Sequence, residues 1–211
     1  IEDLRNKGEF YQIDEDENGT YIMNSKDLML IEHLKEIAEA GVCSFKVEGR
    51  TKTEYYLALV TRAYRQALDE MAAGKSFDPR LADELEKVAN RGYHKGFMMG
   101  APDLKGQVYK PMQTRKYTQR FAGLVKPSAD LTQKNGYIPI EVRGKVVVGS
   151  QCEIIGPNMH SKTFQVSEIL NSHFEPVTSV HGGTGVFYFK IENYQAPKHA
   201  LLSVLEVSPE G

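Results

Sequence analysis

The chain has 211 residues, of which 41% are hydrophobic and 26% are charged, the balance of an ordinary globular protein with a packed core. No apolar run approaches the roughly 18 residues that a membrane-spanning helix needs, and no secretory signal opens the sequence, so we expect no membrane partner. The two cysteines stand far apart in unrelated patterns, which excludes a disulfide framework and favours a cytoplasmic setting.

The net charge of -2 conceals an asymmetry between the two halves of the chain. Residues 1–90 carry a net charge of -7, and residues 91–211 carry a net charge of +5. Such an asymmetry indicates two units, of which the basic one can meet a polyanion. We therefore divide the chain into an N-terminal unit over 1–90, a connector over 91–116 and a C-terminal domain over 117–211.

The first ninety residues combine short β-prone runs with helical periodicity. Apolar residues recur at helical spacing in three segments, and Gly41 and Gly74 follow the first two of them. Thr51 and Glu54 form a capping-box pattern at the start of the second helix. The expected order is a strand over 20–23, a helix over 26–40, a strand over 44–50, a helix over 51–73 and a helix over 79–89.

The second expected strand, residues 44–50, has the least ordinary pattern in the chain. Its apolar residues alternate with Lys46, Glu48 and Arg50, which would share one face. A strand between two helices belongs to a parallel sheet with both faces covered, where charged side chains are costly unless paired or used. In a (β/α) barrel, the C-terminal ends of such strands line the active site. A Lys46–Glu48 ion pair that only fills the barrel interior is an equally weighted alternative.

Four polar residues, Asn24, Ser25, Lys26 and Asp27, follow the first expected strand in the equivalent position. Since both strand ends would point to one rim, we expect these residues to bind substrate beside the charged face of 44–50. The alternative is a plain helix cap, because Asn and Ser are good N-cap residues and a carboxylate in the first turn suits the helix dipole.

Glycines and prolines interrupt residues 91–116, which we interpret as a connector with an embedded motif, RGYHKGF, over 91–97. From Tyr117 the period of hydrophobicity switches to two, and short apolar runs alternate with glycine-rich turns. This pattern predicts a small all-β sandwich or barrel. The expected strands cover 138–142, 146–148, 152–155, 164–169, 186–191 and 201–207.

Between Asp103 and Lys126 the chain holds six basic residues against one acid, with Tyr109 and Tyr117 interleaved. This arrangement is typical of a phosphate-contacting surface with stacking aromatics. A solvated basic face is a slightly commoner explanation for such a run. The candidate nucleic-acid contacts are Lys110, Arg115, Lys116 and Arg120.

Most motifs of known catalytic or metal chemistry are absent from the sequence. It contains no zincin histidine pair, no nucleophile elbow and no phosphate-binding glycine loop. The six histidines are scattered without the spacing of metal ligands, so we expect no metal site in this chain.

Three segments, GTYIMNSKDL, GVCSFKVEGRTKTEYYLALVTRAYRQALD and NRGYHKGF, resemble in order and spacing the later part of the collagenase-like peptidase family U32. The β-rich remainder is similar to that family's C-terminal domain. The resemblance implies the C-terminal portion of a TIM-like barrel, joined to a small β-barrel like domain 2 of elongation factor Tu. Two strands cannot close an eight-stranded barrel. Upstream residues would therefore complete the barrel, or a partner chain would, such as a second copy in a homo-oligomer. A third possibility is that only the β domain is a stable unit in this chain.

The resemblance implies two competing activities. The family name records a collagenase-like peptidase of no established catalytic type, whereas several members hydroxylate a tRNA wobble uridine or an rRNA cytidine with prephenate and an iron–sulfur cluster. We expect a parent enzyme of the tRNA-hydroxylation type, with tRNA and a prephenate-like anion as partners, and no activity in this fragment alone. A peptidase and a non-catalytic RNA- or protein-binding module are the alternatives.

The resemblance also assigns residues. Lys46, Glu48 and Arg50 match the family's F-K-[IV]-E-G-R segment as catalytic candidates, and the cations among them suit a carboxylate ligand. Residues 24–27 match its N-S-K-D-L segment. Many members place a cluster-ligating cysteine directly after that leucine, where this chain has Met29. Since a thioether is a poor substitute for a thiolate at iron, we expect no cofactor in this chain, and Met29 counts against a cluster in the parent protein.

Overall fold

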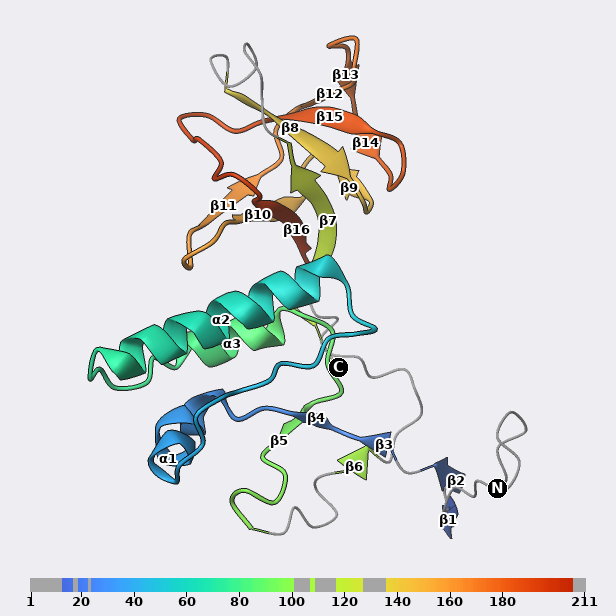
Figure 1. The fold of residues 1–211 in the computed structure, drawn as a ribbon. Helices are drawn as coiled ribbons and strands as arrows, with labels where there is room; N and C mark the ends of the chain where they lie inside the picture. The colour runs from blue at the N-terminus through green and yellow to red at the C-terminus, as the bar shows by residue number, and fades with distance from the viewer. Residues whose placement is uncertain are drawn as a thin grey trace.

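The computed structural model of the chain describes residues 13–16, 19–22, 24–100, 107–108, 117–126 and 136–206. These residues form an N-terminal unit of helices and short strands, followed by an antiparallel β unit (Figure 1). The expected switch to an all-β second half is confirmed, because the described residues after 117 contain strands and no helix.

Helices form the core of the N-terminal unit. The longest begins after Thr53, whose Oγ1 accepts a hydrogen bond from the N–H of Tyr56 at 3.3 Å and so satisfies one of the free donors of the first turn. We expected this cap at Thr51; the observed cap lies two residues later. The bounds are η1 (Ile31–His33), α1 (Leu34–Glu39), α2 (Glu54–Ala72) and α3 (Arg80–Glu86).

The α2 and α3 helices bury their apolar stripes against each other. Leu59 and Ala63, one turn apart on α2, are both fully buried, as are Leu81 and Leu85 one turn apart on α3. Burying one such leucine stabilises the fold by about 1.5–3 kcal/mol. The same core includes Ile31, Leu34, Tyr55, Val60, Ala67 and Val88.

Short strands flank the helices, and one of them occupies the expected start of the first helix. Asp27 pairs with Tyr93 and Leu28 with His94 in a parallel ladder. Because this ladder holds 27–28 in a strand, the helix expected over 26–40 is reduced to η1 and α1; pairing with a distant segment overrides local periodicity. The bounds are β1 (Ile13–Asp16), β2 (Gly19–Ile22), β3 (Asn24–Ser25), β4 (Asp27–Leu28), β5 (Tyr93–His94) and β6 (Gln107–Val108).

The prediction of a strand over 44–50 is wrong. The segment between α1 and α2 has no regular secondary structure, and its alternating pattern does not separate a buried from an exposed face, since Val47 is exposed along with Lys46 and Glu48. A strand needs the backbone of a neighbour, and none of the described strands pairs with these residues.

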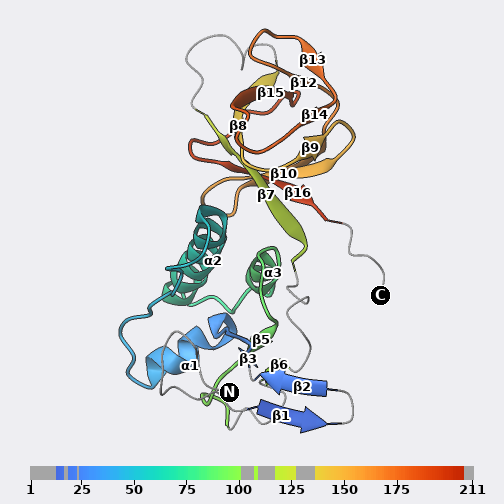
Figure 2. The same cartoon turned by 90° about the vertical axis from the view of Figure 1, so that its right-hand side faces the viewer.

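An eight-stranded antiparallel sheet forms the β unit and curls around its own core (Figure 2). The strand order is β11-β10-β16-β7-β8-β15-β12-β13, with β9 and β14 as a separate pair. The bounds are β7 (Gln119–Val125), β8 (Tyr137–Val142), β9 (Val146–Val147), β10 (Gln151–Ile155), β11 (Ser161–Gln165), β12 (Ile169–Leu170), β13 (Pro176–Val177), β14 (Ser179–Val180), β15 (Val186–Lys190) and β16 (Leu201–Leu205).

Apolar side chains that point inward from neighbouring strands fill the core of the β unit. Ile138, Ile140 and Val142 of β8 are almost fully buried, as is Phe189 of the neighbouring β15. Gly123 of β7 allows close packing here, because a Cβ on it would lie 2.6 Å from Ile140 Cγ2. The sheet can therefore curl tightly over a dry interior.

The helices and the β unit share one interface (Figure 2). The ring of Tyr55 on α2 stacks on Phe121 of β7, with ring centroids 5.5 Å apart. The Tyr55 hydroxyl donates to Gln119 Oε1 (3.1 Å), which also accepts from Ser203 Oγ (2.7 Å). Aromatic packing and satisfied buried polar groups thus hold β7 and β16 against α2.

A buried ion-pair network reinforces the same interface. Arg62 of α2 binds Glu84 of α3 and also donates to the carbonyl of Gly156 in the β unit (2.9 Å). Lys87 binds Glu84 and reaches across to Glu153 of β10, with Nζ 3.0 Å from Oε2. Because these side chains are largely buried and satisfied, the network favours one orientation of the β unit on the helices.

Candidate functional site

The parallel pairing of β4 with β5 brings together two motifs that lie more than sixty residues apart, NSKD at 24–27 and RGYHKGF at 91–97 (Figure 1). The N–H of Asp27 donates to the carbonyl of Gly92 at 2.9 Å. Arg91 donates to both oxygens of the Asp27 carboxylate, from its backbone N–H (3.0 Å) and from Nη2 (2.8 Å). This two-point contact fixes the carboxylate on the strand end.

Asp27 is held as a carboxylate. Partial burial raises the pKa of Asp27, but the hydrogen bonds and charge of Arg91, aided by Lys52, outweigh it and leave the pKa below its usual range. The Asp27 side chain is 20% exposed, so it can still meet a ligand from solvent. The alternative that Asp27 lies in the first turn of a helix is wrong, because its backbone lies in a strand.

Three partly or largely buried tyrosines belong to the same unit, and the charge of Asp27 acts on two of them, Tyr56 and Tyr93. Tyr93 donates its hydroxyl hydrogen to the carbonyl of Leu85 (2.6 Å), and the Tyr64 hydroxyl oxygen accepts from the N–H of Leu30 (3.3 Å). Burial, and then the neighbouring negative charges, raise the pKa of Tyr56 and of Tyr93. The phenols therefore stay neutral at physiological pH and serve as hydrogen-bonding and packing groups.

Lys46, Glu48 and Arg50 lie on the irregular segment before α2. Lys46 Nζ is 3.7 Å from Glu48 Oε2, and the two side chains are 87% and 71% exposed. The Arg50 N–H donates to Glu48 Oε1 (2.9 Å). These residues are solvent-facing in this structure and do not fill a barrel interior; their catalytic roles stay a prediction.

The segment 46–50 nevertheless runs close to the start of α2. A Cβ on Gly49 would clash with the side chain of Leu57, so the glycine allows the backbone to pass over the helix. The charges of both Asp27 and Glu48 raise the pKa of Tyr56, and Lys52 Nζ lies 5.0 Å from its ring centroid. Tyr56 is thus within electrostatic reach of both predicted groups of site residues.

The other predicted residues are placed as follows. The backbones of Asn24 and Ser25 form β3, paired with β6, and Lys26 lies beside Gly92. Arg120 of β7 donates to Glu206 (2.8 Å) and to the carbonyl of Lys145 (2.7 Å), so its guanidinium already has partners within the β unit. Lys110, Arg115 and Lys116 lie outside the described residues.

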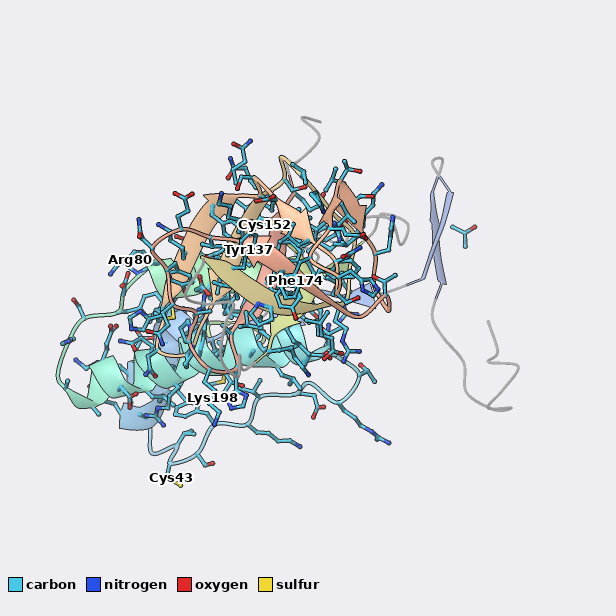
Figure 3. The ribbon with its side chains drawn as sticks, turned by 90° about the horizontal axis from the view of Figure 1, so that it is seen from above. Cys43, Arg80, Tyr137, Cys152, Phe174 and Lys198 are labelled. Carbon is cyan, nitrogen blue, oxygen red and sulfur yellow. The ribbon has the colours of Figure 1, made fainter. Side chains whose placement is uncertain are left out.

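The thiols of this chain do not fit an iron–sulfur cluster. Cys43 is exposed before α2, whereas Cys152 is fully buried in the core of the β unit, where burial raises its pKa to about 12 (Figure 3). Met29 packs against the helical core. Across the described ranges, no three histidine, cysteine or acidic residues are grouped to hold a metal ion.

The helices of the described residues are all too short or too polar to span a membrane.

Comparison with known proteins identifies the family. The model of peptidase family U32 matches residues 2–107, and the model of the U32 C-terminal domain matches residues 117–202. This chain belongs to peptidase family U32.

Curated relatives of this U32 chain include two bacterial tRNA hydroxylation proteins P. The one from Haemophilus influenzae is 37% identical over 175 residues, which cover 83% of this chain and 37% of the relative. The one from Escherichia coli K12 is 40% identical over 157 residues, covering 74% and 34%. A collagenase of Porphyromonas gingivalis is 36% identical over 84 residues, covering 38% and 23%. The chain thus spans about a third of the length of the tRNA hydroxylation proteins it matches.

Among solved structures, the C-terminal domain of a U32 peptidase from Geobacillus thermoleovorans is similar to part of this chain. The two are 19% identical, with a TM-score of 0.36, and the match covers 41% of this chain and 92% of that one.

Sequence reasoning missed the pairing of Asp27 with Arg91 in this U32 chain. The sequence identifies RGYHKGF as part of a connector and as a family motif but assigns it no structural partner, although Arg91, Tyr93 and His94 all contact the N-terminal unit. One available signal was Gly92, whose φ of +79° suits glycine at a point of close approach beside Lys26. A pairing between segments this far apart leaves no local periodicity, so it could not be derived from spacing alone.

Proposed function

We propose that this chain is part of a tRNA-modifying enzyme that hydroxylates a wobble uridine. The observation that carries the proposal is the likeness to two proteins named tRNA hydroxylation protein P, which extends over 74% to 83% of this chain. A tRNA substrate would place the enzyme in the cytoplasm. The β unit would hold tRNA, and the N-terminal unit would contribute part of the reacting site.

The geometry supports a role for each proposed site group. The Asp27–Arg91 pair, in which each carboxylate oxygen accepts a hydrogen bond of 3.0 Å or less, is the fixed frame of the site. Lys46 and Arg50, exposed on the neighbouring segment, would bind the carboxylates of a prephenate-like anion. On this proposal the N-terminal unit is the terminal portion of a TIM-like barrel, and β4 and β5 are two parallel elements of its rim.

The test uses a strain that lacks the gene for the parent protein. Loss of the gene is expected to remove the hydroxylated wobble uridine from digested tRNA, as measured by nucleoside mass spectrometry. The parent protein should restore it, and the Asp27→Asn variant should restore less than a tenth, because the frame loses its charge. Asp69→Asn, which breaks the exposed Arg65–Asp69 pair, is the matched control and should restore it fully. Unchanged nucleosides in the deletion strain would contradict the proposal.

A peptidase is the second candidate, because a collagenase is among the relatives at 36% identity over 84 residues. It would use Glu48, the carboxylate of the matched segment. The pKa of Glu48 is lowered by the Arg50 N–H and by Lys46, so the carboxylate is ionised at neutral pH and can accept a proton, but it is a weaker base than an ordinary glutamate. The parent protein should then cleave gelatin and lose this activity on Glu48→Gln, whereas intact gelatin with the native protein rules the candidate out.

A further inference from the structure

The turn between β12 and β13 presents a phenylalanine in a backbone conformation that bulky residues rarely adopt. Phe174 has a φ of +61°, in the left-handed region. Asn171 builds this turn: its Oδ1 accepts from the N–H of His173 (2.9 Å) and of Glu175 (3.0 Å). The Phe174 N–H donates to the carbonyl of Asn171 (3.0 Å). Glycine or asparagine is the usual residue at such a position, because neither strains the backbone as a bulky side chain does.

Burial does not offset this strain. Met159 also has a positive φ, +59°, but its side chain packs against the helical core. Phe174 remains 56% exposed. The fold needs a left-handed backbone at this position but does not need a phenylalanine there. A bulky residue kept at such a strained position without being buried is grounds for a functional hypothesis.

The Phe174 ring is held as one half of a stack. It lies on the ring of Tyr188 of β15, with centroids 4.8 Å apart and planes 26° from parallel. Tyr188 covers one face of the phenylalanine, so the exposed area is the opposite face and the edge. A further flat ring can continue the stack at low entropic cost, because the first two rings are already in place.

The surroundings favour a flat, isolated partner group. The residues on either side, His173 and Glu175, are exposed and polar, so the apolar area at the turn is little more than one ring. A stable protein interface buries about 800 Å² on each partner, which this ring cannot provide. On the same outer face, Lys190 lies opposite Tyr137, so a cation stands near the stack. Its Nζ lies 4.0 Å from Glu168 and 3.7 Å from Glu192. Figure 3, a view from above, shows Phe174 and Tyr137 over the strands of the β unit.

We propose that the Phe174–Tyr188 stack is a platform for an unpaired base of tRNA. This inference rests on the proposed function for the identity of the RNA. Stacking on an aromatic ring tolerates every base, since each has a π-face, and unpaired loop bases are the ones free to stack. The platform lies at the end of the β unit away from β4 and β5 (Figure 1), so the base it holds is not the one that reacts.

The test compares Phe174→Gly with the native 211-residue chain. Affinity for a fluorescently labelled tRNA transcript is measured by anisotropy at one low salt concentration, and thermal stability is measured in parallel. Phe174→Gly should bind about tenfold more weakly, the order of effect expected for losing one base stack. Its melting temperature should be equal or higher, because glycine relieves the strained φ. A merely structural aromatic would give the opposite result, with lower stability and unchanged affinity.

Two further variants separate stacking from strain. Phe174→Trp keeps a ring and should bind like the native chain. His199→Gly relieves a similar φ of +64° elsewhere in the β unit and should leave affinity unchanged. A duplex RNA of equal length, which has no unpaired base, should bind native and Phe174→Gly chains equally.

The proposal is overturned if Phe174→Gly binds the transcript as tightly as the native chain, if Phe174→Trp loses as much affinity as glycine, or if the native chain binds only an apolar peptide and no RNA. The hydroxylation proposal and the platform proposal are tested by different experiments, so either can fail without the other. A deletion strain with unchanged nucleosides removes the hydroxylation proposal, yet a Phe174-dependent affinity for tRNA would still establish the RNA contact.

Discussion

At the scale of single residues, the Asp27–Arg91 contact is the most specific feature of the candidate site. The backbone N–H and the guanidinium of one arginine meet both oxygens of one carboxylate, and a parallel strand pair holds the two backbones. Hydrogen bonds to charged groups contribute about 1.5–3 kcal/mol when well formed, and the partial exposure of both side chains reduces this through solvent screening. The pair therefore stabilises the fold while remaining accessible.

The contribution of Asp27 to stability should depend on pH. Its folded pKa is lowered, so the contribution is present above the unfolded value of about 3.9 and is lost as the pH falls through the folded pKa. We expect Asp27→Asn to reduce the free energy of unfolding by about 1 kcal/mol at pH 7, with the difference from the native chain shrinking below pH 4. Urea unfolding at several pH values measures this. A difference that persists undiminished at pH 2 would contradict the assignment.

At the scale of elements, α2 connects the two units through charges that are almost completely buried. The Arg62 and Glu84 side chains are 7% and 8% exposed, and Lys87 adds a second cation to Glu84. Breaking a buried pair leaves an uncompensated charge, which costs about 3–5 kcal/mol. Replacing both partners by apolar residues of similar size removes that penalty.

We expect Arg62→Met to reduce the free energy of unfolding by about 3 kcal/mol or more, because Glu84 and the carbonyl of Gly156 lose their partner. The double variant with Glu84→Met should recover part of that loss, which a double-mutant cycle in urea unfolding would show. Arg65→Met is the matched control on the same helix. Its pair with Asp69 is about 60% exposed on both sides, so the loss should stay below about 1 kcal/mol.

At the scale of the whole molecule, the described residues form two cores in contact. The helical core includes Ile155 and Leu201 of the β unit, and Phe121 and Leu124 of β7 pack against it. Tyr55 is shared between the units through its ring and its hydroxyl. The two units are therefore expected to unfold together rather than one after the other.

Denaturant unfolding followed by helical circular dichroism and by tyrosine absorbance should give coincident transitions for the native chain. Tyr55→Ala removes the shared ring and should cost about 3–5 kcal/mol. It should also separate the two transitions. Tyr194→Ala is a useful comparison, because Tyr194 packs only on the core of the β unit and should leave the transitions coincident. Separate transitions in the native chain would show that the interface does not couple the units.

Local patterns in the sequence determined a good part of this outcome. Helical periodicity predicted a helix over 51–73, where α2 runs over Glu54–Ala72, and period-two alternation located β8, β10, β15 and β16 within one or two residues. The family could also be recognised from motifs alone. These features depend on neighbours in the chain, where side-chain spacing and backbone geometry are directly linked.

Only the tertiary structure decided the rest, because it depends on partners far along the chain. Alternation over 44–50 predicted a strand, but a strand exists only beside another, and no described strand pairs there. Helical spacing over 26–40 was overridden at 27–28 by pairing with β5, which also placed Asp27 beside Arg91. The exposure of Phe174 was likewise unreadable from composition, since it follows from a turn that Asn171 closes and from the position of Tyr188 on a separate strand.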